Sequence, residues 1–274
     1  MRVTSVGEVV ARGSRSIVHA YGPGAVVKVP NPTTPASWIV SEAKYAEAVR
    51  GVGAPAPRLL GIEQIDGRPA SVWERLDGIS MWQHVIDRPE RAVQAGQQLA
   101  DVQLELFELV PPVTLPAQRD RLTSKIRRAA ATVDASLLHA LDLLPPRDQA
   151  PRLCHGDLHP SNVILARGGP MLVDWFDAAR GDPIADIARS SLTLLSNGAS
   201  PPDHLPGADR ATLEGLTGAY LARLHDRLDI DDELLARWQA VSAVGRIAEG
   251  VASGPLLEVW TRFAVAGGAQ AAAN

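Results

Sequence analysis

The sequence predicts an α+β protein with a small antiparallel β-sheet lobe, which carries one helix, followed by a larger, mostly helical lobe. Three observations support this prediction. Up to about Leu76 the apolar residues come in short runs typical of strands, and from about Ile79 they recur with helical spacing. Apolar residues make up 46% of the 274 residues, which is enough for a sizeable core. We expect the two lobes to span residues 1–77 and 78–274.

Turn residues divide the first lobe. Arg12-Gly-Ser-Arg-Ser16 separates the first two β-prone runs, and Tyr21-Gly-Pro-Gly24 is a strong turn signal. Ser37 is placed to cap the helix that follows. The predicted strands cover residues 7–11, 17–21, 25–29, 59–62 and 70–73, and the predicted helix covers residues 38–50.

Prolines divide the second lobe. Pro89 stands at the start of its first helix, and the pairs Pro111-Pro112 and Pro145-Pro146 end the first and second helices. Two short apolar runs, around Leu153 and at 171–173, predict strands. The predicted helices cover residues 89–109, 119–144, 184–196, 209–228, 231–252 and 255–266, and we expect the tail 267–274 to be frayed.

The composition excludes several classes of protein. A formal charge of −4 argues against a general nucleic-acid binder, which needs a basic face to neutralise phosphates. The one cysteine, Cys154, excludes a disulfide framework and a cysteine-rich zinc site. We find no signal peptide, and no window approaches the ~18 uninterrupted apolar residues of a membrane span. We therefore expect a cytoplasmic globular protein with neither nucleic acid nor membrane as a partner.

The densest polar segment is Cys154-His-Gly-Asp-Leu-His-Pro-Ser-Asn162, and Asp174 follows twelve residues beyond it. The apolar runs between Asn162 and Asp174 are joined by a turn at 166–170 that has the length of a hairpin loop, so the two side chains would lie side by side. A carboxylate and an amide suit Mg²⁺, which leaves its other positions to water and phosphate. Asp157 would face the same space and could orient a hydroxyl or accept its proton.

These segments resemble those of a known family. HGDLHPSN at 155–162 and VDWFDAARGDPIADIA at 173–188 closely resemble the catalytic loop and metal-binding segment of the aminoglycoside phosphotransferase and choline kinase superfamily, which has the bilobal protein-kinase-like fold. Lys28 resembles the family's phosphate-binding lysine and Glu42 its ion-pair partner, although Glu47 on the same helix is an alternative. The resemblance covers about residues 5 to 190.

The resemblance implies a phosphotransferase that moves the γ-phosphate of ATP, or of GTP in its place, to a hydroxyl of a small molecule with the help of Mg²⁺. By position, Asp157 would be the catalytic aspartate, and Asn162 and Asp174 would hold the magnesium ion. Asp186 would be a buried acceptor that fixes the backbone of the catalytic loop. His155 would pack and hydrogen-bond beneath that loop.

The resemblance also implies where the nucleotide binds. The segment 71–78 is similar to the family's hinge between the lobes, so the backbone of Glu74 and Leu76 would bind the nucleobase. The family's phosphate loop is often rich in glycine, but this chain has only Gly13 there. Backbone amides could still cradle a phosphate in this loop, with the hydroxyls of Ser14 and Ser16 added.

Two other enzyme classes could use the same residues. A metallohydrolase would use the spacing of His155, Asp157 and His159 to hold zinc, but this hypothesis leaves the phosphate-binding lysine without a role. A protein kinase needs a long activation segment, whereas only 11 residues separate Asp174 from Asp186. We therefore expect a small molecule, and not a protein, as the acceptor.

The charge is unevenly spread. From Gly181 onward there are 12 Asp and Glu against 7 Arg and no Lys, whereas residues 1–180 carry 20 bases and 19 acids. An acidic second lobe would attract a cationic acceptor such as an aminoglycoside, and a kinase of a choline-, homoserine- or sugar-type metabolite is the alternative. Arg246 and Glu249 either line the acceptor pocket or face solvent. The acids at 231–233 are better explained by a helix N-terminus. The acceptor's identity and the oligomeric state stay open.

Overall fold

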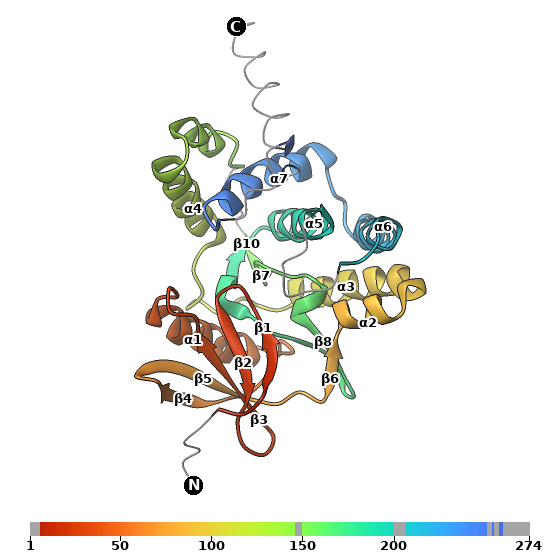
Figure 1. Cartoon of the computed structure of the whole chain (residues 1–274). Helices are drawn as coiled ribbons and strands as arrows, with labels where there is room; N and C mark the ends of the chain where they lie inside the picture. The colour runs from red at the N-terminus through yellow and green to blue at the C-terminus, as the bar shows by residue number, and fades with distance from the viewer. Residues whose placement is uncertain (1–5, 146–149, 200–206, 251–253, 255–257, 260–274) are drawn as a thin grey trace, which may run out of the picture.

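The computed structural model describes residues 6–145, 150–199, 207–250, 254, 258 and 259. The chain forms two lobes, with the strand-rich lobe in the lower half of Figure 1 and the helical lobe above it. The predicted α+β class and the order of the two lobes are therefore confirmed.

The first lobe is a five-stranded antiparallel sheet with the strand order β1-β2-β3-β5-β4. Helix α1 (Ala36–Gly51) packs against β4 and β5 with a side that buries Ile39, Ala43, Ala46 and Val49. The same side of α1 also buries one carboxylate, Glu42. The strands are β1 (Val9–Arg12), β2 (Ser16–Ala20), β3 (Ala25–Pro30), β4 (Leu59–Ile65) and β5 (Arg68–Glu74).

The second lobe surrounds two small sheets with helices. The sheets have the strand orders β6-β8-β9 and β10-β7, and α5 packs against both α6 and α7. Helices α3 and α6 approach closely at Gly96, where a Cβ atom would lie only 2.2 Å from the backbone oxygen of Leu216. The α-helices are α2 (Met81–Asp87), α3 (Ala92–Phe107), α4 (Gln118–Thr132), α5 (Pro183–Ala199), α6 (Arg210–Arg227) and α7 (Asp232–Ile247).

Short elements connect these helices and shape the cleft. The remaining strands are β6 (Gly78–Ser80), β7 (Arg152–Cys154), β8 (Val163–Ala166), β9 (Gly169–Leu172) and β10 (Ala179–Gly181). The 3-10 helices are η1 (Pro89–Arg91), η2 (Ala135–Leu141), η3 (Pro160–Asn162) and η4 (Trp175–Asp177).

The largest departure from the sequence prediction is the helix expected at 119–144, which is two elements, α4 and η2. The chain leaves helical geometry at Asp134, whose backbone is extended and whose Oδ1 accepts the N–H of Ser136, so that it caps η2. Helix α2, capped by Ser80, was not predicted. Most of the helix expected at 255–266, and the whole tail 267–274, lie outside the described residues. None of the helices in the described part of the chain is long and apolar enough to cross a membrane.

Candidate active site

Lys28 lies in β3, and its side chain reaches from the first lobe to a residue of the second. Its ammonium group donates to Oε1 of Glu42 at 2.6 Å and to Oδ1 of Asp174 at 3.3 Å. Burial alone would lower the pKa of Lys28, but the carboxylates of Asp174 and Glu42 outweigh it and raise that pKa. The expected partner of Lys28 is therefore Glu42, while Glu47 is exposed. One cation thus connects the first lobe to a carboxylate of the second.

The β8–β9 hairpin brings Asn162 and Asp174 together, as the spacing predicts. Val163 pairs with Leu172, and the N–H of Val173 donates to the carbonyl oxygen of Asn162 at 3.0 Å. The side-chain Nδ2 of Asn162 donates to the carbonyl oxygen of Asp157 at 2.9 Å, so its amide oxygen is the atom that can bind a cation. Asp174 has φ = 65°, a left-handed conformation that is uncommon for a residue other than glycine and typical of functional sites.

The catalytic loop is held from below by Asp186 at the start of α5. Its carboxylate accepts the backbone N–H groups of His155 at 3.2 Å and Gly156 at 2.8 Å, and Gln103 donates to it at 3.0 Å. Gly156 has φ = 79°, and a Cβ atom there would lie 2.2 Å from the backbone oxygen of Asp177. Only glycine fits this turn, which aims the next residue, Asp157, toward the cleft.

His155 lies under the loop and is not arranged to bind a metal. Its Nδ1 is 3.3 Å from the N–H of Asp157, and its Nε2 is 3.2 Å from the carbonyl oxygen of Val173, so both ring nitrogens are engaged. Burial lowers the pKa of His155, which favours the neutral ring. Within the described residues no three His, Cys, Asp or Glu side chains gather as a metal site. This geometry disfavours the zinc hydrolase hypothesis.

The carboxylate of Asp157 is held by cations of the second lobe. Arg189 of α5 donates to Oδ1 at 3.2 Å, Arg246 of α7 lies 3.9 Å from the same atom, and His159 lies 3.8 Å from Oδ2. Burial alone would raise the pKa of Asp157, but Arg189, His159 and Arg246 outweigh it and hold that pKa well below its usual range. Asp157 is therefore ionised at neutral pH and is a weak base.

Arg189 was missed by the sequence analysis. It stands three residues after Asp186 on α5, so helical spacing places it on the side of α5 that faces the catalytic loop. One of its nitrogen atoms, NH2, lies 3.0 Å from Glu249, 3.2 Å from Asp157 and 3.9 Å from Asp177. The i+3 position after the loop-fixing aspartate was the signal that could have identified it.

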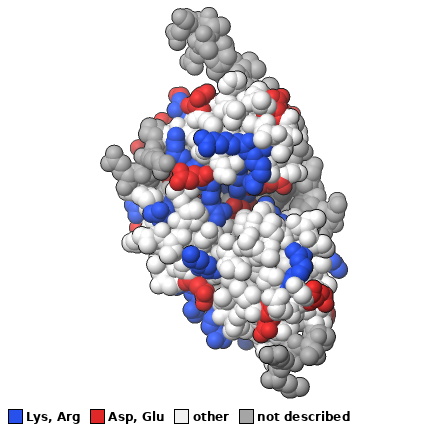
Figure 2. Space-filling view, turned by 90° about the vertical axis from the view of Figure 1, so that its left-hand side faces the viewer, with Lys and Arg blue, Asp and Glu red and all other residues white. Residues whose placement is uncertain are grey.

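Arg246 and Glu249, which the sequence left open, are both buried beside this cluster. Arg246 donates to Oγ1 of Thr193 at 2.8 Å, and Glu249 pairs with Lys125 of α4 at 2.6 Å. Burial alone would raise the pKa of Glu249, but Arg189 and Lys125 lower it to about 2. Figure 2 views the side of the molecule on which α1 and α4 lie and shows a band of Lys and Arg across its upper, helical half.

The residues expected to bind the nucleotide lie in two separate segments, one at the end of β5 and the other at the turn from β1 into β2. Glu74 ends β5, and its N–H donates to the carbonyl oxygen of Arg58 at 3.0 Å. Leu76 follows in the connection to the second lobe, as a hinge residue would. Ser14 is exposed in the turn between β1 and β2, whereas Ser16 is buried at the start of β2 opposite Pro30. The two serines therefore do not lie together at the tip of this turn.

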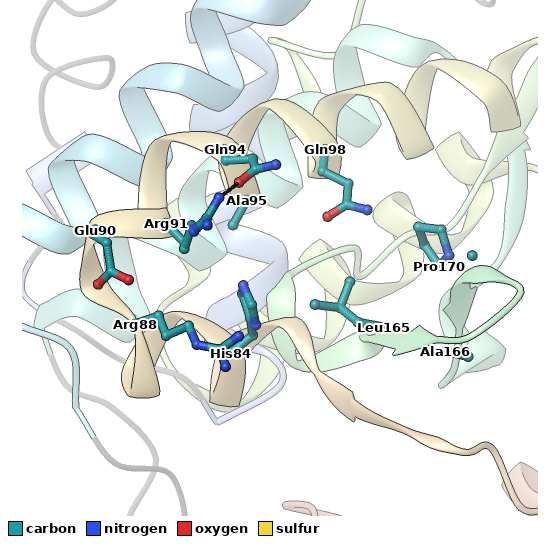
Figure 3. A pocket seen from close by; sticks show the side chains of 11 residues that line it. His84, Arg88, Glu90, Arg91, Gln94, Ala95, Gln98, Leu165, Ala166 and Pro170 are labelled. Carbon is teal, nitrogen blue, oxygen red and sulfur yellow. Dashed lines mark hydrogen bonds between the residues drawn. The ribbon is translucent and has the colours of Figure 1, made fainter.

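One cavity on the described part of the chain lies away from these residues. It has a volume of about 450 Å³ and lies between α2, α3 and the β8–β9 hairpin. Figure 3 shows His84, Arg88 and Arg91 on one side of it, with Leu165 and Pro170 on the other. Lys28, Asp157 and Asp174 do not line it, so its size does not make it the site of chemistry.

The arrangement can be compared with known proteins. No curated protein matches the chain significantly. A solved structure of an aminoglycoside-3'-phosphotransferase of type VIII matches with a TM-score of 0.63 and 22% identity, over 88% of this chain and 92% of that one. A thermostable mutant of aminoglycoside phosphotransferase APH(4)-Ia, in a ternary complex with AMP-PNP and hygromycin B, matches with a TM-score of 0.61 and 17% identity. That match covers 91% of this chain and 88% of the other. Choline kinase from Cryptosporidium parvum matches with a TM-score of 0.52 and 10% identity, over 87% of this chain and 80% of the other.

At these identities the solved structures show that the fold is shared. The family relationship comes from the sequence, because residues 13–220 match the phosphotransferase enzyme family over most of the chain. That stretch includes Lys28, Asp157 and Asp174, the residues that the fold brings to the cleft. The chain belongs to the phosphotransferase enzyme family.

Proposed function

We propose that this protein is an ATP-dependent kinase that phosphorylates a hydroxyl group of a small molecule. The observation that carries the proposal is the position of Lys28, which contacts Glu42 and Asp174 at once and so lies between the two lobes. An ammonium group in this position suits the phosphates of a nucleotide that binds in the cleft. The hinge backbone at Glu74 and Leu76 would bind the base, and GTP stays an alternative to ATP.

Asn162 and Asp174 would hold a magnesium ion. The fit rests on the donor set, because an ionised carboxylate and an amide oxygen, brought together by the hairpin, are oxygen ligands of the kind that Mg²⁺ takes. When bound there, the ion would neutralise charge on the nucleotide phosphates. Lys28 would release its contact with Asp174 to a phosphate oxygen while Glu42 keeps its side chain in place.

Asp157 would act on the acceptor. The acceptor oxygen forms a bond to the γ-phosphorus while the bond from that phosphorus to the ADP oxygen breaks, and the hydroxyl proton passes to Asp157. Because Arg189 and Arg246 lower its pKa, Asp157 orients the hydroxyl through most of the reaction and takes the proton late. A loose transition state requires no more than this, because the alcohol stays protonated until the bond to phosphorus forms.

The acceptor is a small molecule in this proposal. Only 11 residues separate Asp174 from Asp186, and they form η4, β10 and the start of α5, which leaves no long segment to hold a peptide. The sequence favoured an aminoglycoside or another cationic antibiotic, and one neighbouring structure contains hygromycin B. A metabolite kinase is the alternative. A cytoplasmic location and a role in antibiotic resistance stay predictions.

The variant Asp157→Asn tests the role of Asp157. It keeps the shape of the side chain and removes the charge, so we expect turnover of Mg²⁺–ATP to fall about 10²–10⁴-fold, the usual contribution of a positioned base. ATP affinity should stay within about twofold, because Asp157 does not contact Lys28. Turnover is measured in a single-turnover assay and affinity by titration calorimetry. Weakened ATP binding together with an unchanged chemical step would show that Asp157 is a scaffold residue.

A further inference from the structure

A second cavity is connected to Asp157 through one buried side chain, Arg189. It has a volume of about 370 Å³, within the range of small-molecule sites, and lies between α1, α4, η4 and the end of α7. Arg189 joins it to Asp157, because its NH2 atom contacts Asp157 and also Glu249, which lines the cavity. The cavity is lined chiefly by basic and aromatic side chains, namely Arg15, Trp38, Arg121, Lys125, Arg128 and Phe176.

Helix α4 supplies most of the charge. It carries Arg or Lys at five of its 15 positions and a single acid, Asp120. Arg121, Lys125 and Arg128 are spaced by four and three residues, so they share one face of the helix, and that face lines the cavity. Arg127, which directly precedes Arg128 in the chain, is exposed and does not line the cavity.

The charges around this cavity do not balance. The four cations that line it, together with Arg189 and Arg246, make six positive side chains, against the three carboxylates of Asp157, Asp177 and Glu249. In the described part of the chain no carboxylate lies within 4.0 Å of the guanidinium of Arg15 or Arg128. This group of side chains therefore has three positive charges in excess.

Buried donor atoms indicate the same imbalance. The Nε atoms of Arg121, Arg189 and Arg246 are buried and have no hydrogen-bond partner within the described residues. Burial, followed by the like charge of Arg189, lowers the pKa of Arg246. Buried donors of this kind are stabilised by an acceptor that bears negative charge.

Four of the acids from Gly181 onward, which made the second lobe acidic in the sequence, have structural roles outside this cavity. Asp209 and Asp231 cap the N-termini of α6 and α7. Asp182 accepts the N–H of Ile184 and the indole N–H of Trp238, and Asp186 fixes the catalytic loop. These four acids therefore do not neutralise the cations that line the cavity.

We propose that the acceptor is a hydroxyl compound that also carries a carboxylate or a phosphate. The inference rests on the proposed kinase function. The acceptor hydroxyl lies at Asp157, and its anionic group reaches past Arg189 into the cavity, where Arg121, Lys125 and Arg128 bind it. Trp38 and Phe176 stack at 4.7 Å between centroids and form an apolar wall beneath Arg15, which suits the carbon skeleton of such a compound.

Four probes of one shape and different charge test this inference. Glucose, glucuronate, glucose 6-phosphate and glucosamine are titrated by calorimetry into the protein saturated with ADP and Mg²⁺, which occupy the nucleotide site. We expect glucuronate or glucose 6-phosphate to bind at least tenfold more tightly than glucose, and glucosamine to bind more weakly than glucose. The comparison of the two anions shows whether the site prefers a carboxylate or a phosphate.

The matched variants are Arg128→Glu and Arg127→Glu. Each reverses the charge of one exposed arginine of α4. Arg128→Glu should weaken the anionic probe about tenfold or more and leave glucose unchanged, while Arg127→Glu should change neither. The inference would be overturned if glucosamine bound more tightly than glucose, or if all four probes bound equally or not at all. It would also be overturned if the two variants had equal effects.

ATP titrated into wild type and into Lys28→Ala separates the two proposals. If wild type does not bind ATP, the kinase function fails, whereas ATP binding without anion binding defeats only the acceptor class.

Discussion

Replacing Gly156 by alanine tests how the catalytic loop is built. The added Cβ would lie 2.2 Å from the backbone oxygen of Asp177, and it would stand at φ = 79°. A left-handed backbone costs alanine roughly 1–2 kcal/mol, and the added methyl group costs about 1–3 kcal/mol as overpacking. We therefore expect Gly156→Ala to lose about 2–5 kcal/mol of unfolding free energy, a large part of the ~5–15 kcal/mol that holds a typical domain together.

The same substitution should impair catalysis. Real Cβ contacts are not shorter than about 3.0 Å, so the loop and Asp177 must separate by close to 1 Å, and Asp157 is the next residue. A displacement of 1 Å in a catalytic group can cost about 10²-fold in rate. Stability is measured by urea denaturation and rate by turnover of Mg²⁺–ATP. Gly168→Ala is the control, because a Cβ there meets no atom within 4 Å, and it should change stability by no more than ~0.5 kcal/mol. Equal stability and equal rates in the two variants would refute the reasoning.

Two further predictions concern single charges. Asp174→Ala should abolish magnesium-dependent turnover while far-UV circular dichroism stays unchanged, and Asn162→Ala should be milder because an amide supplies no charge. Near-normal turnover of Asp174→Ala at saturating magnesium would disprove the metal role. For Glu249, Arg189 and Lys125 lower the pKa from 4.5 to about 2, so its ionised form stabilises the fold above pH 4.5 and this stabilisation is lost as the pH falls toward 2. Wild type should lose roughly 3 kcal/mol more than Glu249→Gln across that window in denaturation curves, and parallel pH profiles would contradict this.

The sequence predicted the groups that lie close together along the chain. Asn162 and Asp174 are joined by a hairpin whose length could be counted, and their proximity followed from it. The pairing of Lys28 with Glu42 is longer in range, but a strand followed by one helix leaves few ways to arrange it. The roles of these residues in catalysis stay predictions until the variants are measured.

The surroundings of Asp157 could not be predicted in the same way. Arg189 and Arg246 reach it from α5 and α7, and the packing of two helices is decided by the whole core and not by the pattern of either helix. A count of acids from Gly181 onward does not separate those that cap helices, such as Asp209 and Asp231, from those that lie beside Asp157. The break between α4 and η2 was missed because Asp134 lies within a run of helix-forming residues.

The position of Glu249 and Arg246 along the chain has a consequence for biosynthesis. Arg246 lies in the last turn of α7 and Glu249 two residues beyond the helix, whereas Asp157 comes about ninety residues earlier in the chain. During translation the first lobe and the loop that holds Asp157 leave the ribosome before these side chains do. In that interval Arg189 faces Asp157 and Asp177 without the carboxylate of Glu249. The charge that surrounds Asp157 is therefore completed only when α7 and the residues just after it have been made.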